Sequence, residues 1–393
     1  MLDWAIWSVA IGLFLVTLPG TIELAIITIG ALLPGRPSQK ASRGSADVKL
    51  AAIIPVYNEE AGLARTVRSL GNCDNPLPQS DIIVMACNTT DGTVRVAHEL
   101  GCRVIERIDP TRRGKGYGLN YAFKQLAGEG YDAYVIIDAD TVVDGNFLNE
   151  FRTVFAEGKD AGQAILRVAN PGSNSSTRLL NIAFLAFTYL RPLARRRLGL
   201  SSGIFGNGFG VRASIIAEVP YECFSIAEDL EYHARLVRAG KKVHFLPRTS
   251  VQTEMCVSRA QARPQRERWE GGRFRVMWNE GPSLLTSLFS RPRMATLEAL
   301  LDLALLPLVY HALALCILAV IGSGWLVGYA LLSLALMLIH VCQSMSLGRA
   351  GVRDWFALTT IPVYLAWKLL NIGRILRAAR KTMPWQRTER MVG

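Results

Sequence analysis

The long apolar segment from Trp4 to Leu33 limits most strongly what this chain can fold into. It exceeds the roughly 20 residues that an α-helix needs to cross a bilayer. Its main interruptions are Glu23 and the pair Pro19-Gly20. No basic segment precedes it and no small-residue cleavage site follows, so we expect a retained anchor rather than a signal peptide. Residues 1–35 are therefore predicted to form a transmembrane helix.

A second apolar region lies between residues 294 and 347. It contains two segments, Leu297 to Val320 and Trp325 to Met345, which the short turn Ile321-Gly322-Ser323-Gly324 joins. Each segment is long enough to span a membrane. We predict two further transmembrane helices here.

The basic residues around the first segment predict its orientation. Only Asp3 precedes it, whereas Arg36, Lys40, Arg43 and Lys49 follow it. Basic residues are enriched on the cytoplasmic side of membranes. We therefore expect the N-terminus outside and the central region in the cytoplasm.

The end of the chain, residues 354–393, combines apolar and basic sequence. The stretch Trp355 to Leu370 contains Pro362 and Lys368 and leads directly into a strongly basic tail. A crossing would place this tail outside, so we favour an amphipathic helix lying in the inner membrane interface. A fourth span is the alternative.

The net charge of +12 also points to membrane lipids or phosphate ligands. Basic clusters occur at Arg191 to Arg197, Arg259 to Arg275 and Arg374 to Arg390. Such clusters suit anionic head groups or diphosphates. Nucleic acid is not expected as a partner, because no recognition module is present and two clusters lie near membrane segments. The seven cysteines show no paired metal-type spacing and are expected to be reduced thiols.

The central region, residues 49–290, alternates short apolar runs with helical stretches. This alternation predicts an α/β domain with a mostly parallel sheet. The expected strands are Leu50 to Pro55, Asp81 to Ala86, Arg103 to Glu106 and Ala133 to Asp138. The expected helices are Glu59 to Leu70, Thr93 to Leu100 and Gly116 to Ala127.

Right-handed crossovers would place three polar loops on one rim of this sheet. These are Val56 to Glu60, Cys87 to Gly92, and Asp138 to Asp140. The first loop lacks G-x-G-x-x-G, which excludes the dinucleotide fingerprint. Gly206 to Gly210 comes later, and by itself predicts only a flexible loop.

The tripeptide Asp138-Ala139-Asp140 is the strongest chemical signal in the chain. It follows an apolar strand, and side chains two residues apart in a strand point to the same side. Paired carboxylates at the carboxyl end of a strand suit Mg²⁺ or Mn²⁺ shared with substrate phosphates. The alternative is a turn with two solvated aspartates.

Two helices carry further candidates. Ser225 and Glu228 fit a capping box at the start of a helix running to about Ala239, which leaves Asp229 available for chemistry. Later, Gln265, Arg268 and Trp269 share one helix face. A guanidinium and an indole suit a diphosphate beside a sugar ring. An interfacial helix with its Trp and Arg at the head groups is the alternative.

Together these motifs resemble the membrane-bound branch of the inverting family 2 glycosyltransferases, which contains cellulose, chitin and hyaluronan synthases and bacterial exopolysaccharide enzymes. The resemblance covers Ile53 to Trp269. Each motif is weak alone, but five occur in the expected order. They are Pro55 to Glu60, Arg113 to Tyr117, Asp138 to Asp140, Glu228-Asp229, and the Q-x-x-R-W signature at Gln265 to Trp269. The ending Trp385 to Arg390 also resembles bacterial exopolysaccharide members.

The resemblance implies a GT-A fold and a set of residue roles. Asp229 would be the catalytic base, and Asp138 with Asp140 would hold Mg²⁺ or Mn²⁺. The residues expected to bind the nucleotide-sugar donor are Pro55, Tyr57, Glu59, Lys115, Asp138, Gln265, Arg268 and Trp269. The acceptor would be a polysaccharide or a lipid-linked molecule at the bacterial inner membrane, with export or assembly proteins as possible partners.

One residue departs from the family pattern. Relatives carry an Asp that contacts the nucleobase where this chain has Cys87. A carboxylate accepts the N3 proton of uracil, whereas a thiol accepts poorly. A UDP-sugar remains the first expectation, with less support than in relatives. A processive polysaccharide synthase and a catalytically silent scaffold of an assembly complex are the alternative functions.

Overall fold

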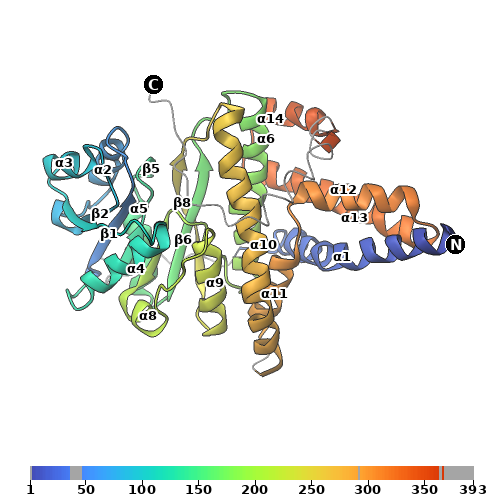
Figure 1. Cartoon of the computed structure of the whole chain (residues 1–393), viewed down its shortest axis with the longest axis horizontal. Helices are drawn as coiled ribbons and strands as arrows, with labels where there is room; N and C mark the ends of the chain where they lie inside the picture. The colour runs from blue at the N-terminus through green and yellow to red at the C-terminus, as the bar shows by residue number, and fades with distance from the viewer. Residues whose placement is uncertain (1, 36–46, 291–292, 363–364, 367–393) are drawn as a thin grey trace.

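The structure is a computed structural model that describes residues 2–35, 47–290, 293–362, 365 and 366. Figure 1 shows an α/β domain at one end and a bundle of long helices, which contains the N-terminus, at the other. The predicted basic tail and the end of the predicted interfacial helix lie outside the described residues, as do Arg36, Lys40 and Arg43. Their roles stay predictions.

The α/β domain is built on an eight-stranded sheet in the order β3-β2-β1-β4-β7-β6-β8-β5. The strands are β1 Leu50–Val56, β2 Ile82–Cys87, β3 Arg103–Arg107, β4 Ala133–Ile136, β5 Thr141–Val143, β6 Ala161–Val168, β7 Phe209–Arg212 and β8 Val243–Thr253. The first four pair in parallel, as predicted. Strand β7 is antiparallel to β4 and β6, and β5 is antiparallel to β8, so the second half is mixed.

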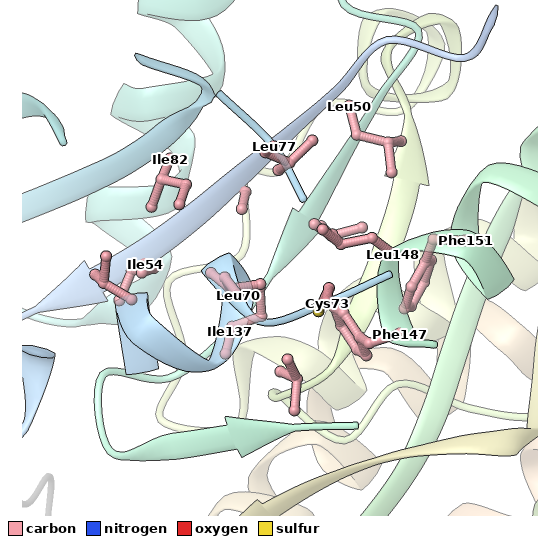
Figure 2. Close-up of a cluster of buried hydrophobic side chains, with 14 of the residues drawn as sticks. Leu50, Ile54, Leu70, Cys73, Leu77, Ile82, Ile137, Phe147, Leu148 and Phe151 are labelled. Atoms are coloured by element: carbon pink, nitrogen blue, oxygen red, sulfur yellow. The ribbon is translucent and has the colours of Figure 1, made fainter. Parts of the chain in front are cut away.

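Two buried layers cover the faces of this sheet because side chains alternate along each strand. Leu50 and Ile54 of β1 point into the first layer, whereas Ile53 points into the second. Figure 2 shows the first layer, where Phe147 lies beside Phe151 and Leu70 lies beside Ile137. The first layer is closed by α2 Leu63–Gly71, α3 Thr93–Glu99 and α5 Phe147–Ala156; the second by α4 Lys115–Leu126, α8 Ala213–Glu218 and α9 Glu228–Arg238.

Among the described residues, two helices are long and apolar enough to cross a bilayer. They are Trp4–Gly30, within α1 Leu2–Gly30, and α13 Trp325–Leu347. The predicted span from Leu297 to Val320 is not one straight helix. It is a broken pair, α11 Met294–Ala304 and α12 Leu308–Ile321, bent by 72°, and whether the pair crosses the bilayer as one span stays a prediction. Proline lacks the N–H that would continue a helix, and Pro307 immediately precedes α12.

Long helices connect the two parts. Helix α6 Ser175–Phe184 continues through a π-helical turn, η3 Leu185–Leu190, into α7 Arg191–Leu198. Helix α10 Arg259–Ser290 stands between the sheet and the bundle of α1, α12 and α13 (Figure 1). The remaining short elements are η2 Gln79–Asp81, α14 Val352–Ala357 and η4 Leu358–Thr360. Helices that join sheet and bundle bring polar loops of the domain next to apolar membrane segments.

Candidate functional site

The acidic tripeptide lies where the sequence predicted it, directly after β4. The backbone N–H of Asp138 donates to Asn207 Oδ1 at 3.0 Å. The carbonyl of Asp140 accepts from Arg65 Nη2 at 3.2 Å, and Thr141 Oγ1 lies 3.4 Å from Asp140 Oδ1. The tripeptide is therefore held by contacts with other elements and is not a freely solvated turn.

Lys115, the first residue of α4, joins this acidic site to the start of α9. Its ammonium forms an ion pair with Asp138 and donates to the carbonyl of Gly206. Burial acts to lower the pKa of Lys115, but the charges of Asp138, Glu228 and Asp229 outweigh it and raise the pKa above its ordinary value. Lys115 is therefore a fixed positive charge within a group of carboxylates.

Glu228 and Asp229 begin α9 on the other side of Lys115. A Cβ placed on Gly206 would lie 3.1 Å from Asp229 Oδ2, so the Asp229 carboxylate rests against Gly206. Burial, reinforced by the charge of Asp229, raises the pKa of Glu228 to about 7. Burial likewise raises the pKa of Asp229. A raised pKa suits a carboxyl that acts as a general base near neutral pH.

The predicted capping box at Ser225 is wrong. The N-cap of α9 is Ala227, without a side-chain cap. The N–H of Ser225 instead donates to Glu231 Oε2 at 3.2 Å. Glu228 is therefore not committed to a cap.

Arg268 and Trp269 face the same space from α10. The Trp269 ring lies 5.9 Å from the ring of Phe184 in α6, and 39% of Trp269 is exposed. Gln265 is buried and, among the described residues, does not line this space. Arg268 and Trp269 thus share the site as predicted, whereas Gln265 packs inside.

A single cavity of about 1110 Å³ contains this chemistry. Lys115, Asp138, Asp229, Arg268 and Trp269 all line it. Its remaining wall is largely apolar and comes from α6, η3 and the membrane helices. That part includes Leu24 of α1, Val309 and Ala312 of α12, and Met337 and Val341 of α13. The cavity therefore runs from the acidic rim of the sheet to the membrane bundle.

The loop after β1 lies on the same rim but outside the wall of this cavity. Pro55, Tyr57 and Glu59 are not among the described residues that line the cavity. Asp140 of the acidic tripeptide is not among them either. The N–H of Glu59 donates to Thr93 Oγ1 at 2.8 Å, which ties this loop to α3. The predicted donor roles of Pro55, Tyr57 and Glu59 therefore stay predictions.

Cys87 ends β2 and contacts a partly buried cation. Its Sγ accepts from Arg107 Nη1 at 3.6 Å, and Arg107 pairs with Asp109 at 2.7 Å. The centre of the Arg107 guanidinium lies 5.6 Å from the centre of the Tyr117 ring. The position that departs from the family pattern thus borders a guanidinium and an aromatic ring.

The acidic tripeptide suits a divalent cation shared with a phosphate. Among the described residues, no group of three or more His, Cys, Asp or Glu side chains could hold a metal alone. Mg²⁺ is commonly bound by one or two carboxylates together with substrate phosphates and water. Asp138 keeps 38% of its side chain exposed although Lys115 pairs with one of its oxygens. Asp138 and Asp140 therefore fit a metal that arrives with a diphosphate.

The sequence analysis missed two residues that hold the site together. Asn207, which is 3% exposed, accepts from Asp138 N–H and donates to Thr141 and Thr253. Buried Gln163 donates to the carbonyls of Asn207 and Gly208. The segment Gly206 to Gly210 is thus a fixed part of the site and not merely a flexible loop. Asn207 is the one polar side chain in this segment, which otherwise consists of three glycines and Phe209, and it was the available signal.

Comparisons with known proteins show the family and the fold of this chain. A family model described as "Glycosyltransferase like family 2" matches residues 47–272. The chain is 26% identical over 208 residues to a probable glycosyltransferase of Bacillus subtilis, covering 51% of this chain and 49% of the relative. It is 27% identical over 288 residues to the β-monoglucosyldiacylglycerol synthase of Trichormus variabilis, covering 69% and 60%. The chain therefore spans about half to three fifths of the length of these two relatives.

A third relative is covered more fully. The polyprenol monophosphomannose synthase of Mycolicibacterium smegmatis is 30% identical over 253 residues, covering 58% of this chain and 88% of the relative. Among solved structures, the mannosyltransferase of Pyrobaculum calidifontis in complex with GDP-Man and Mn²⁺ matches with a TM-score of 0.56 at 14% identity, covering 93% and 98% of the two chains. This likeness confirms the GT-A fold. Since the family model covers more than half of the sequence, the chain belongs to the glycosyltransferases of family 2.

Proposed function

We propose that this protein transfers a sugar from a nucleoside-diphosphate donor to a lipid-linked acceptor, with inversion at the anomeric carbon. The observation that carries the proposal is the shared cavity. Its polar end contains Asp138, Lys115 and Asp229, and its apolar end is walled by membrane helices. Ligand pockets commonly measure about 300–1,000 Å³, so about 1110 Å³ offers space for a donor and part of an acceptor.

The donor occupies the polar end. Lys115 and Arg268 supply positive charge near the diphosphate, where negative charge develops as the nucleotide leaves. Asp138 and Asp140 would hold Mg²⁺ or Mn²⁺, which stabilises charge on the phosphate oxygens when bound. A UDP-sugar is the first candidate, and the structural neighbour that was solved with GDP-Man and Mn²⁺ makes guanosine donors the first alternative to test.

Asp229 acts as the general base. It accepts a proton from the acceptor hydroxyl, whose oxygen then attacks the anomeric carbon from the face opposite the nucleotide. The raised pKa of Asp229 suits this role, since a base works best with a pKa near the working pH. Lys115, held between Asp138 and the Gly206 carbonyl, keeps the charge of the site balanced before the donor binds.

The acceptor reaches Asp229 through the apolar part of the cavity. A polar acceptor would gain little from walls made of Leu24, Val309 and Ala312, whereas a lipid tail gains free energy from them. Two relatives carry names that refer to lipids, the β-monoglucosyldiacylglycerol synthase and the polyprenol monophosphomannose synthase. A lipid acceptor is therefore favoured over a growing soluble polymer.

The setting that fits this reaction is the inner membrane of a bacterium, with the α/β domain in the cytoplasm, where sugar nucleotides are made. Helices α1 and α13 would anchor the enzyme, and the broken pair α11 and α12 would reach into the bilayer between them. The product would enter glycolipid or exopolysaccharide synthesis, where export or assembly proteins would be its partners.

Product analysis tests the proposal. The full-length protein in nanodiscs is incubated with a panel of radiolabelled sugar nucleotides, Mn²⁺ and bacterial lipid extract. We expect label in the organic phase, a β-linked product from an α-linked donor by mass spectrometry and NMR, and a rate of labelling about 10²- to 10⁴-fold lower with Asp229→Asn. Label only in a water-soluble polymer would favour a processive synthase. No nucleotide release with any donor would favour a silent scaffold.

A further inference from the structure

A buried charge cluster lies at the junction between the polar and apolar parts of the cavity. It joins helices α1, α7, α10 and α11. Its members are Glu23, Arg191, Arg195, Arg273, Glu298 and Asp302. The three arginines belong to basic stretches that were predicted to suit anionic head groups or diphosphates, whereas their acidic partners were not predicted.

The three arginines of this cluster do not contact the same number of carboxylates. Arg195 contacts Glu23 at 3.2 Å, Asp302 at 3.3 Å, and also Glu298. Arg191 and Arg273 contact Asp302, the latter at 3.0 Å. Arg191 and Arg273 both line the cavity. The two guanidiniums that face the cavity thus share one carboxylate, which Arg195 also contacts.

Arg191 also has an unused donor. Its side chain is 95% buried, and Nε has no hydrogen-bond partner among the described residues. The guanidinium lies 4.8 Å from the centre of the Phe187 ring, which also lines the cavity. A buried donor without an acceptor costs roughly 1–3 kcal/mol. An anionic ligand in the cavity would satisfy it.

The position of these two arginines defines the kind of anion. Arg273 Nε donates to the carbonyl of Leu305 at 3.2 Å, at the break between α11 and α12. Leu305 and the next residues line the cavity, and Val309 and Ala312 continue its apolar wall. The cations therefore stand where an apolar tail would end and a head group would begin.

We propose that the acceptor lipid carries a phosphate in its head group and that Arg191 and Arg273 hold this phosphate. This inference rests on the proposed function and names the acceptor class. A phosphate supplies several acceptor oxygens, which match the planar donor fork of a guanidinium. The tail lies along α12 and α13, and the head group extends towards Asp229.

Binding of three matched probes tests the proposal. Dodecyl phosphate, dodecanol and inorganic phosphate are titrated into the full-length protein in neutral detergent, and binding is read by native mass spectrometry. We expect dodecyl phosphate to bind at least tenfold more tightly than either other probe, because only it uses both the cations and the apolar wall. Equal affinity for dodecanol would overturn the phosphate role. Equal affinity for inorganic phosphate would overturn the lipid role.

Variants locate the effect. Arg191→Gln and Arg273→Gln should each reduce the preference for dodecyl phosphate over dodecanol about tenfold or more. The matched control is Arg248→Gln, which breaks an exposed pair with Glu150 and should leave the preference unchanged. Nucleotide affinity in the presence of Mn²⁺ verifies that each variant is folded. If the glutamine variants do not fold, Arg191→Lys and Arg273→Lys replace them. These lysine variants keep the charge and should show a reduced preference for dodecyl phosphate over dodecanol. A wild-type preference in both the glutamine and the lysine variants overturns the assignment.

The outcome is distinguishable from failure of the proposed function. Sugar transfer to a phosphate-free lipid, with no preference for dodecyl phosphate, would leave the transfer reaction standing and remove the phosphate. Absence of any labelled lipid would remove the proposed function, whatever the three probes show.

Discussion

Replacing Asn207 with alanine is expected to weaken donor binding, although Asn207 does not line the cavity among its described residues. The side chain is 3% exposed and makes three hydrogen bonds. Its Oδ1 accepts from the N–H of Asp138 at 3.0 Å, and its Nδ2 donates to Thr141 and Thr253 at 2.8 and 3.0 Å. It therefore fixes the backbone of the acidic tripeptide.

The magnitude follows from what each partner loses. The N–H of Asp138 would lose the acceptor that Asn207 supplies, at a cost of about 1–3 kcal/mol. Thr141 and Thr253 lose less, because their hydroxyls also lie 3.2 Å from each other. If Asp138 moves in Asn207→Ala and thereby avoids about 2 kcal/mol of this cost, binding in the original position must recover the same free energy. Metal-dependent nucleotide binding would then weaken roughly 30-fold.

Isothermal titration of the nucleotide with and without Mn²⁺ measures this loss. The matched control is Asn146→Ala, which removes one surface hydrogen bond to the carbonyl of Arg248 and should change affinity by less than about 0.5 kcal/mol. Wild-type nucleotide affinity in Asn207→Ala would refute the argument that this side chain positions Asp138.

Three further predictions concern the carboxylates. Asp229→Asn should lower kcat by about 10²- to 10⁴-fold while nucleotide affinity is retained, and an unchanged kcat would remove Asp229 from the mechanism. Because burial and Asp229 raise the pKa of Glu228 to about 7, the pair binds a proton as the pH falls through that value. Turnover should therefore decline as the pH falls below this value. In Glu228→Gln, initial rates should show that this acid-side decline has moved to lower pH. A pH–rate profile identical to that of the wild type would contradict an interaction between Glu228 and Asp229. Asp140→Ala should abolish the Mn²⁺-dependent part of nucleotide binding in calorimetry, and a preserved metal effect would place the cation elsewhere.

The first half of the sheet was predictable because its signals are local. Strands β1 to β4 and helices α2 to α4 follow one another with clear periodicity, and their bounds agree with the prediction to within a few residues. Strands β5 to β8 were not predicted, because their pairing joins segments far apart in the chain. Gly208 illustrates the difference. It has φ of +66°, and a Cβ there would lie 2.6 Å from Val251, a requirement that appears only when β8 is in place.

The acidic and basic residues of the candidate site were predicted from the sequence. The residues that hold them in place and the apolar part of the cavity were not. Asp138, Lys115 and Asp229 were found by motif, and the structure brings them to one cavity. The predicted cap at Ser225 is wrong because α9 begins at Glu228, after its N-cap Ala227. Glu231 of α9 accepts the Ser225 N–H instead. The bend before α12 had a local signal, Pro307, that the prediction of one span did not use. The apolar wall depends on how α1, α6, α12 and α13 pack together, which no local pattern contains.

The claim that one cavity joins the donor site to a lipid path is tested most directly by narrowing its apolar part. Ala312→Trp would fill space beside the α12 wall, whereas Val320→Trp, at a position of the same helix that is 83% exposed, is the matched control. In nanodiscs with donor, Mn²⁺ and lipid extract, we predict that Ala312→Trp loses labelled lipid product and keeps nucleotide affinity, while Val320→Trp keeps both. Full lipid product from a folded Ala312→Trp protein would contradict the account.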